Sequence, residues 1–472
     1  MEQILENPTL SRSLRQARAE IRQLPPERVA LAALDIGKNV HVGYLATLAG
    51  PIMRPIKLPT LKVGFEYFTK ELDQLVASGE YDLIILGHEP TGIYHESWGA
   101  NLIVRYAAHM IGEASPPIRY RQVNPVLVKR ERERLSSHYR KDDFIDTYAI
   151  TNLLAQGVGS NVSVLDHAVF NLRLCLRQMT RLSKQQARVQ IDILRTMERL
   201  WPGALGNKKK FKAAHPDMPP LKHLVDSKPM QRIRLRHLLE HCPNPYDLLE
   251  LGCEGIIKLF RQHGERCGKV TAQRILDVAQ QSLLPPVGLA NALAAEVHQT
   301  WKLYLTYEEQ IKSYEQEAIR FVPDTPAAAI TSIPGINELL AARYLAPLGD
   351  YTRFKKASEI WSFAGFDPLL KQSGNHRKIG QTSKRGSPYL RDTLFVIGHL
   401  LISHCPDCTR VYYKAEQRGM SSVGAIIHVA NKANRIMFSL LRSQGVYKSP
   451  LSEAESQKWK QYAKKRRARK KK

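Results

Sequence analysis

The sequence RVALAALD, residues 28–35, decides how the first part of the chain folds. It is a short apolar run that ends on an acid, which is typical of a strand buried on both faces. A second apolar run, LIIL at residues 83–86, is closed by a glycine. Between them, residues 40–44 alternate apolar and other side chains, as in a half-buried strand. These patterns predict at least three strands of one sheet.

Helical patterns lie between and after these strands. A polar amphipathic helix is predicted around residues 62–78, another over residues 94–109 and a third over residues 142–156, where apolar side chains repeat at helical spacing. Strands separated by helices favour an α/β layer whose sheet faces are covered. We therefore expect an α/β domain over residues 28–160, preceded by a polar helical extension over residues 1–27.

The middle of the chain has a different pattern. Residues 166–200 and 289–321 contain little Gly or Pro and repeat apolar residues at three- and four-residue steps, as in heptad seams. Ordinary helix packing and a paired coiled coil that also dimerises both account for this pattern. We expect a coiled-coil region over residues 161–321, with a small helical insert over residues 201–288.

Residues 322–448 are predicted to form a mainly α C-terminal domain. Its Pro334-Gly335 turn lies between two short helical stretches, and such a turn can point backbone N–H groups at a phosphate, as in helix-hairpin-helix modules. A plain helix–helix connection is equally consistent, because Asn337 stands where a second glycine is common.

Charge indicates the class of partner. The 472 residues carry 70 Lys and Arg against 44 Asp and Glu, a formal net charge of +26, which favours a polyanion such as nucleic acid. Eight of the last nine residues are basic, and we expect this run, residues 464–472, to be a solvated, disordered arm at the end of a basic tail over residues 449–472. The sequence contains no apolar run of about 18 residues and no signal pattern, so no membrane partner is expected. The six cysteines lack the spacing of a disulfide framework.

Four acids are the first candidates for chemistry. Asp35 ends one apolar strand and Glu89 follows another, and functional sites gather at strand ends in open α/β sheets. Asp143 and Asp146 are three residues apart on a predicted helix and therefore face the same way. Clustered carboxylates repel unless cations neutralise them, and hard oxygen ligands suit Mg²⁺, the usual metal of phosphoryl transfer.

Several short motifs occur in the order seen in one family. They are LDIGK (34–38), EPTG (89–92), VNP (123–125) with Val128 and Lys129, KDDFID (141–146), IPGI (333–336), FAG (363–365), QSG (372–374), SKRG (383–386), Leu390 with Arg391, and ANK (430–432). The chain resembles the DEDD transposases of bacterial insertion sequences, which are bridge-RNA-guided recombinases related to the Piv DNA invertases. The resemblance covers roughly residues 30–160 and 325–448. It implies a ribonuclease H-like (RuvC-like) fold for the first domain.

The resemblance also implies site residues. The acidic quartet falls on Asp35, Glu89, Asp143 and Asp146, which would bind Mg²⁺ or Mn²⁺, and the nucleophilic serine falls on Ser373. Asp142 replaces the usual Thr, so it is the residue most easily mistaken for Asp143. From the residues alone, Ser383 and Ser387 are equally good candidates for the nucleophile. The residues expected to contact nucleic acid are Lys38, Lys129, Lys141, Pro334, Gly335, Arg377, Lys378, Lys384, Arg385 and Arg391.

The function implied is RNA-guided DNA cleavage and exchange through a phosphoserine intermediate. The implied partners are donor and target DNA, a guide (bridge) RNA and further copies of the chain, as a dimer or tetramer, in the bacterial cytoplasm near the nucleoid. Alternatives are a RuvC-like metal nuclease or Holliday-junction resolvase that uses water, a Piv-like invertase, and a nucleic-acid-binding protein with an inactive core.

Overall fold

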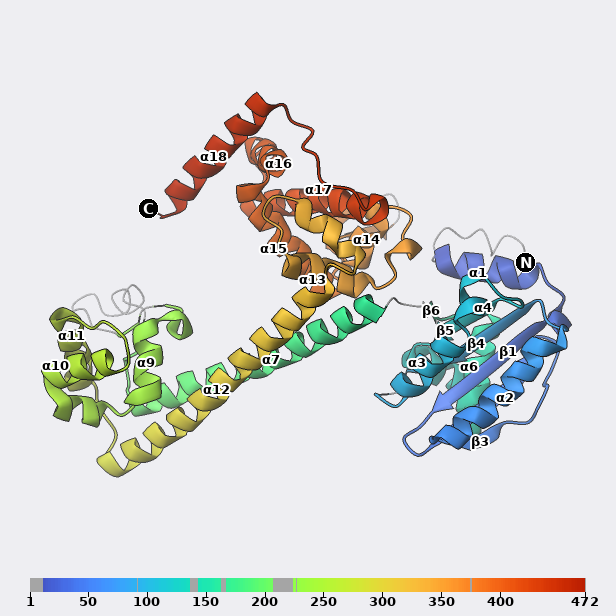
Figure 1. The fold of residues 1–472 in the computed structure, drawn as a ribbon, viewed down its shortest axis with the longest axis horizontal. Helices are drawn as coiled ribbons and strands as arrows, with labels where there is room; N and C mark the ends of the chain where they lie inside the picture. The colour runs from blue at the N-terminus through green and yellow to red at the C-terminus, as the bar shows by residue number, and fades with distance from the viewer. Residues whose placement is uncertain are drawn as a thin grey trace. The chain divides into compact units, whose positions relative to one another are not determined.

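The computed structural model describes residues 12–90, 92–135, 143–162, 167–206, 224–225, 227–373 and 376–471. For Arg12, Ser13, Asp143, residues 368–381 and residues 469–471 it describes the backbone alone. The chain divides into two compact units, Met1–Asp166 and His167–Lys472 (Figure 1). Within the described ranges, no helix is both long and apolar enough to cross a membrane.

The first unit is built on a six-stranded mixed sheet in the order β3-β2-β1-β4-β5-β6. Strands β1, β4 and β5 run parallel, while β2, β3 and β6 pair antiparallel with their neighbours. The elements are α1 (Arg12–Arg22), η2 (Pro26–Arg28), β1 (Val29–Ile36), β2 (Val40–Thr47), β3 (Ile56–Pro59), α2 (Lys62–Ser78), β4 (Leu83–His88), α3 (His95–Arg105), α4 (Ala107–Ile111), β5 (Ile118–Gln122), α5 (Pro125–Leu135), α6 (Asp143–Ala155) and β6 (Ser160–Asn161).

Alternation along β1 explains why its sequence is apolar over residues 29–34. Ala30, Ala32 and Leu34 pack in the core beneath α2 and α3. Leu31 and Ala33 point to the opposite face, where they pack with buried residues of α5 and α6. Because both faces of a central strand are covered, neither set of side chains is polar. The α/β architecture predicted from residues 28–160 is therefore confirmed at the level of a covered mixed sheet.

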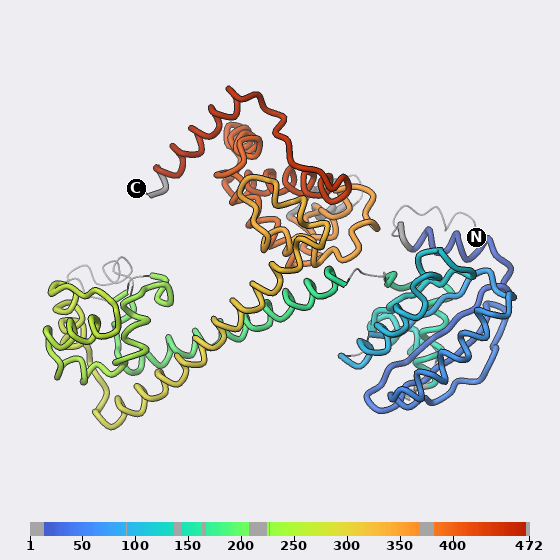
Figure 2. The backbone as a smooth tube through the Cα atoms, viewed as in Figure 1, coloured from blue at the N-terminus to red at the C-terminus, as the bar shows by residue number. Residues whose placement is uncertain are grey.

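The second unit contains a pair of long helices, an insert between them and a C-terminal domain. Helices α7 and α12 lie side by side (Figure 1), and Figure 2 follows the chain out along α7, through the insert and back along α12. The elements are α7 (His167–Leu200), η3 (Pro229–Gln231), α9 (Ile233–His241), α10 (Pro245–Gln262), α11 (Lys269–Gln281), α12 (Val287–Phe321), η4 (Pro326–Ser332), α13 (Glu338–Leu348), η5 (Tyr351–Arg353), α14 (Ala357–Phe363), β7 (Pro368–Ser373), β8 (His376–Thr382), α15 (Pro388–His404), α16 (Pro406–Gln417), α17 (Ser422–Ser443) and α18 (Glu453–Lys471).

One apolar core joins the insert to the adjoining halves of α7 and α12. Trp201 and Trp301 are fully buried in it, together with Phe260 of α10. The guanidinium of Arg236 lies 5.1 Å from the ring centre of Trp301 and pairs with Glu308 of α12 at 2.7 Å. The heptad pattern of the two long helices is thus used within one chain, to hold the insert.

Two segments differ from the sequence expectation. The helix predicted over residues 94–109 is broken at Tyr106, whose buried phenol donates a hydrogen bond to Asp73 Oδ1 at 2.8 Å. The tail expected to be a disordered arm is instead helix α18. Trp459 and Ala463 are buried beneath it, and the phenol of Tyr462 donates to Glu416 Oε2 at 2.8 Å. These apolar and aromatic residues, spaced along a basic sequence, dock the helix.

Gly335 provides a test of the turn between η4 and α13. Its φ is +97°, and a Cβ there lies 2.4 Å from His404 Cβ. Gly335→Ala is expected to lower the free energy of unfolding by about 2–4 kcal/mol, combining left-handed strain with overpacking. Urea unfolding followed by circular dichroism measures this. Gly288→Ala is the control, because no atom lies within 4 Å of its added Cβ; equal stability of the two variants contradicts the prediction.

Candidate active site

Two of the predicted acids lie at the same end of neighbouring parallel strands. Leu34 of β1 is paired with His88 of β4, so Asp35 and Glu89 occupy the next position along each chain. Side chains alternate between the two faces of a strand. Asp35 therefore lies on the same face as Leu31 and Ala33, which pack against α6. In the same way, Glu89 is assigned to the face of Leu83 and Ile85, which belong to the same core. Both residues are half-buried.

Helix α6 brings the other two acids to this end of the sheet. Asp35 is paired with Val42 of β2, which is paired with Lys57 of β3. Phe144, in the first turn of α6, lies under the ammonium of Lys57, with 5.5 Å between the nitrogen and the ring centre. The helix therefore begins at the level of Asp35. Its first residue is Asp143, and Asp146 follows one turn later.

Asp146 is buried and paired with an arginine that the sequence did not single out. Arg132 of α5 donates from one nitrogen to both carboxylate oxygens, at 2.7 and 2.9 Å. One residue earlier on the same helix, Glu131 pairs with Arg134, and this cation lowers the pKa of the Glu131 carboxyl. No spacing rule links Arg132 to Asp146, because the two lie on separate helices. The pair provides the charge compensation that a buried carboxylate needs.

The four predicted acids offer oxygen atoms as possible ligands for a divalent cation. Four carboxylates supplied by β1, the end of β4 and α6 are hard oxygen ligands of the kind that Mg²⁺ and Mn²⁺ take, and their backbones meet at one end of one face. The described side chains, from which that of Asp143 is left out, contain no group of three His, Cys, Asp or Glu that could hold a metal. Asp35, Glu89 and Asp146, whose side chains are described, therefore form no such group in this structure, although their oxygen donors are of the kind the cation takes.

His88 is a buried titratable group directly before Glu89. Its Nδ1 is hydrogen-bonded to the phenol of Tyr120 at 2.8 Å, and its ring centre lies 5.4 Å from that of His95. Burial, with a smaller contribution from His95, lowers the pKa of His88 to about 3. Burial also raises the pKa of Tyr120. At neutral pH the His88 imidazole is therefore uncharged.

This lowered pKa makes the fold acid-sensitive in a defined range. An unfolded histidine takes up a proton near pH 6.5, whereas folded His88 does so only near pH 3. Its contribution to stability is therefore complete above about pH 6.5 and falls as the pH drops. Between pH 7 and pH 5 we expect the free energy of unfolding of His88→Asn to fall by about 2 kcal/mol less than that of wild type. Urea unfolding at both pH values measures the difference; parallel pH profiles contradict it.

Ser373 is the last residue of a β-hairpin strand and not part of a long loop. It is paired with His376 of β8, so residues 374–375, which lie outside the described residues, connect the strands. Arg377 and Lys378 follow on β8, opposite Gln372 and Lys371. The structure thus places Ser373 at the end of a strand in a two-stranded ribbon.

The FAG and SKRG motifs pack against each other beside this hairpin. A Cβ at Gly386 lies 2.4 Å from the Phe363 carbonyl oxygen, so the two backbones approach too closely for any side chain. Arg391 donates to the carbonyls of Ala364, at 2.9 Å, and Lys384, at 3.3 Å, and so ties both segments to α15. Arg391, a predicted nucleic-acid contact, thus also braces these two segments. Lys384 and Arg385 are exposed.

The structure also assigns roles to the two competing serines. Ser387 caps α15, its hydroxyl accepting from the Leu390 amide at 3.2 Å. Ser383 accepts from the Arg385 amide at 3.3 Å. Both hydroxyls are thus engaged with the backbone of their own loop.

The remaining predicted nucleic-acid contacts are dispersed. Lys38 is exposed in the turn between β1 and β2, and Lys129 is exposed on α5, with Glu133 at 3.9 Å. Pro334 and Gly335 are exposed in the turn before α13, where Asn337 caps the helix by accepting from the Leu340 amide. Lys141 lies outside the described residues. None of these placements tests the predicted contacts.

The ANK motif and the two neighbouring cysteines have a packing explanation. Lys432 lies 3.1 Å from the fully buried carboxylate of Asp407, which also pairs with Arg410. Cys405 and Cys408 are buried free thiols, and Cys405 Sγ lies 3.5 Å from the phenol of Tyr447. These contacts join α15, α16 and α17 to the end of the domain.

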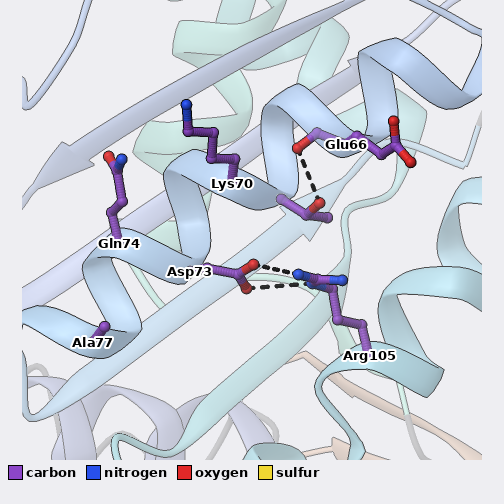
Figure 3. Close-up of a pocket in the computed structure, with 7 residues that line it drawn as sticks. Glu66, Lys70, Asp73, Gln74, Ala77 and Arg105 are labelled. Atoms are coloured by element: carbon purple, nitrogen blue, oxygen red, sulfur yellow. Dashed lines mark hydrogen bonds and ion pairs between the residues drawn. The ribbon is translucent and has the colours of Figure 1, made fainter.

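A shallow hollow on α2 lies away from these acids. It is lined by Glu66, Thr69, Lys70, Asp73, Gln74, Ala77 and Arg105, and an ion pair between Asp73 and Arg105 crosses it (Figure 3). Helix α2 covers the face of the sheet opposite α6. The hollow therefore belongs to the structural helix layer and not to the carboxylate end.

Comparison with known proteins finds a family similarity within the second unit. Residues 327–414 match the Transposase IS116/IS110/IS902 family. The matched segment runs from η4 to α16. It includes the β7–β8 hairpin, the FAG and SKRG motifs and Arg391, which links them to α15. The chain is thus similar to transposases in the part that carries Ser373.

Relatives with similar sequences include proteins of insertion elements, matched over about half of their length. The chain is 23% identical to the IS110 insertion element 43.6 kDa protein of Streptomyces coelicolor, over 45% of this chain and 52% of that protein. It is 24% identical to a protein of Pseudomonas aeruginosa named as a probable family 20 transposase, over 41% and 58% of the two chains. The pilin gene-inverting protein of Moraxella bovis is 23% identical over 31% of this chain and 48% of its own length. The chain spans about half the length of these relatives.

Proposed function

We propose that the protein is a DNA recombinase of the transposase type, which cuts and rejoins the ends of a mobile element. The observation that supports the proposal is the register of β1 with β4, which puts Asp35 and Glu89 one position beyond a paired Leu34 and His88, at the end of the sheet where α6, with Asp146, begins. The family match over residues 327–414 supports transposition as the process.

The proposal assigns two sets of residues to the reaction. Asp35, Glu89, Asp143 and Asp146 would hold Mg²⁺ or Mn²⁺, which supplies charge neutralisation at phosphate oxygens when bound. Ser373 Oγ attacks the scissile phosphorus, the bond from phosphorus to the leaving strand oxygen breaks, and that oxygen takes up a proton. A second strand hydroxyl then displaces the serine, which recovers its proton. Because the ester keeps the energy of the phosphodiester, rejoining needs no ATP.

Cations near Ser373 in sequence have a role in this scheme. Arg377, Lys378, Lys384 and Arg385 are assigned to the scissile phosphate, where they would spread transition-state charge. A guide RNA that pairs with donor and target DNA, and assembly of several protomers, complete the proposal. Both rest on the resemblance described above and on the net charge of +26.

The two processes named among the relatives, transposition and gene inversion, share this chemistry and differ in how the DNA sites are arranged. A reaction of the purified protein, its co-purifying RNA, Mg²⁺ and plasmids carrying the element junction and a target distinguishes them by sequencing of the products. Insertion joints are the expected result. Inverted segments alone indicate an invertase, and nicked DNA without new joints contradicts recombination and indicates a nuclease that uses water.

A further inference from the structure

All the basic residues of the long helix α7 lie on one of its faces. The spacing of four, four, three, four, seven and four residues keeps them within an arc of about 80°, at 100° per residue. The set, named here the α7 stripe, is Arg173, Arg177, Arg181, Lys184, Arg188, Arg195 and Arg199. From Arg173 to Arg199 it extends about 39 Å.

Apart from Arg199, which lies 3.9 Å from Glu296 of α12, the α7 stripe faces away from the helix that packs on α7. Buried residues of α7 such as Leu172, Met179 and Met197 lie on the opposite side, where α12 packs. Six of the seven stripe residues are exposed, and Arg173 is half-buried. A long polar helix face can be solvated by charges of either sign, as on α12, which has three basic and five acidic residues. Helix α7 has seven basic residues and only two acids, so solvation alone does not account for its charge.

The stripe begins against a further arginine of the C-terminal domain. Arg173 lies near Arg177 and Arg353, and burial and then these two cations lower its pKa. Arg353 stacks on the rings of Phe354 and Phe363, 4.6 and 5.0 Å from their centres. Phe363 opens the FAG motif. Like charges gathered at a partly buried point are costly unless an anion joins them.

The length and composition of the stripe indicate the form of the anion. A straight track of about 39 Å exceeds one helical turn of a DNA duplex, about 34–36 Å. Binding of single strands relies on a series of aromatic platforms. Phe170 is the single phenylalanine, tyrosine or tryptophan of α7, so bases have no such series. Phosphates of a rigid duplex match the features of this surface.

We propose that the α7 stripe is a docking track for the backbone of duplex DNA, which it guides from the C-terminal domain towards the insert. This inference rests on the proposed function, because relatives named as transposases and gene inverters make DNA the expected duplex. The contacts are to phosphates and carry no sequence preference. The track therefore adds affinity and orientation to the DNA that the catalytic residues cut.

The test compares two triple variants of the full-length protein. Arg181→Ala, Lys184→Ala and Arg188→Ala remove the centre of the stripe, and Lys302→Ala, Lys312→Ala and Arg320→Ala remove the same charge from exposed positions of α12. Binding of a labelled DNA duplex of about 30 base pairs, more than two turns, is measured by fluorescence anisotropy between about 50 and 200 mM salt. Thermal melting verifies that both variants fold.

The stripe variant is expected to bind duplex DNA roughly 10- to 100-fold more weakly, with the slope of log K against log salt smaller by about three. The α12 variant is expected to change affinity by less than about threefold. A variant with Arg181→Lys and Arg188→Lys should keep most of the wild-type slope, because phosphate contacts need charge rather than geometry.

Several results overturn the inference. Equal losses of DNA affinity in both triple variants show that only total charge matters. If the stripe variant loses binding to an RNA duplex of the same sequence while its DNA binding is unchanged, the partner of the stripe is RNA and not DNA. Wild-type protein with no salt-dependent DNA binding contradicts the proposed function itself. Wild-type binding that the stripe variant retains in full contradicts the track alone.

Discussion

Ser373→Ala is expected to abolish strand exchange, lowering its rate by at least about 10³-fold, because no other group can form the covalent ester. The substitution removes one oxygen at the end of β7 and leaves the pairing of β7 with β8 intact, since that pairing uses backbone groups. Folding and DNA affinity should therefore equal those of wild type. Product joints quantified by sequencing measure the rate.

Ser383→Ala is the matched control for this variant. Its hydroxyl accepts one bond from the Arg385 amide, so its loss affects a local turn and not the reaction. The control is expected to retain exchange within about threefold, as for a neutral hydrogen bond of about 0.5–1 kcal/mol. Exchange that persists in Ser373→Ala, or is lost equally in Ser383→Ala, contradicts the assignment of the nucleophile.

Asp35→Asn is expected to reduce DNA cleavage by at least about 10³-fold, comparable to the loss of a principal electrostatic contributor to catalysis. The amide keeps the size of the side chain, and half-burial at the end of β1 leaves room for it. The change removes one negative charge from the proposed cation site. In a Mg²⁺ titration, the residual cleavage should reach half of its maximum at a higher Mg²⁺ concentration than wild-type cleavage does.

Asp82→Asn is a control in the same sheet. Asp82 lies just before β4, at the opposite end of the strand from Glu89, and forms an exposed ion pair with Arg28 at 2.5 Å. Exposed pairs contribute little to stability. Cleavage should stay at the wild-type level in this variant. If Asp35→Asn cleaves DNA as fast as Asp82→Asn does, the carboxylate of Asp35 has no part in the mechanism.

Two of the three strands that the sequence predicted have uniform apolar runs. The third, over residues 40–44, was expected to be half-buried, whereas β2 is buried at every position from 41 to 46. Strands β1 and β4 are covered on both faces, so residues 29–34 and 83–86 are apolar at every position and the pattern is unambiguous. Strand β5, IRYRQ, was missed because Arg121 is buried on one face with its guanidinium bound to the Gly157 carbonyl. The short β3 and the β7–β8 hairpin have too few residues for a period to emerge.

Helix α18 shows the converse error. Its charges indicated an unfolded arm, and the spacing of Trp459 and Ala463 that docks it is visible only once α16 provides a partner. Density of charge predicts solvation, but a few well-spaced apolar residues are enough to order a helix on an existing surface.

For the site, the rule that ligands gather at the carboxyl ends of parallel strands selected Asp35 and Glu89, and the sheet register is consistent with it. Arg132 escaped prediction because its pairing with Asp146 depends on how α5 and α6 pack. Ser373 was selected by resemblance alone, since nothing in its local sequence separates it from Ser383 or Ser387.

The most direct test of the central claim is to locate the covalent bond between protein and DNA. Wild-type protein is incubated with Mg²⁺, its RNA and labelled junction DNA, denatured, and digested with trypsin and nuclease before mass spectrometry. Trypsin cuts after Lys371 and Arg377, and residues 372–377 contain one hydroxyl, that of Ser373. The account predicts nucleotide mass on this peptide. Recombination without any protein-linked nucleotide, or with the nucleotide on another peptide, contradicts it.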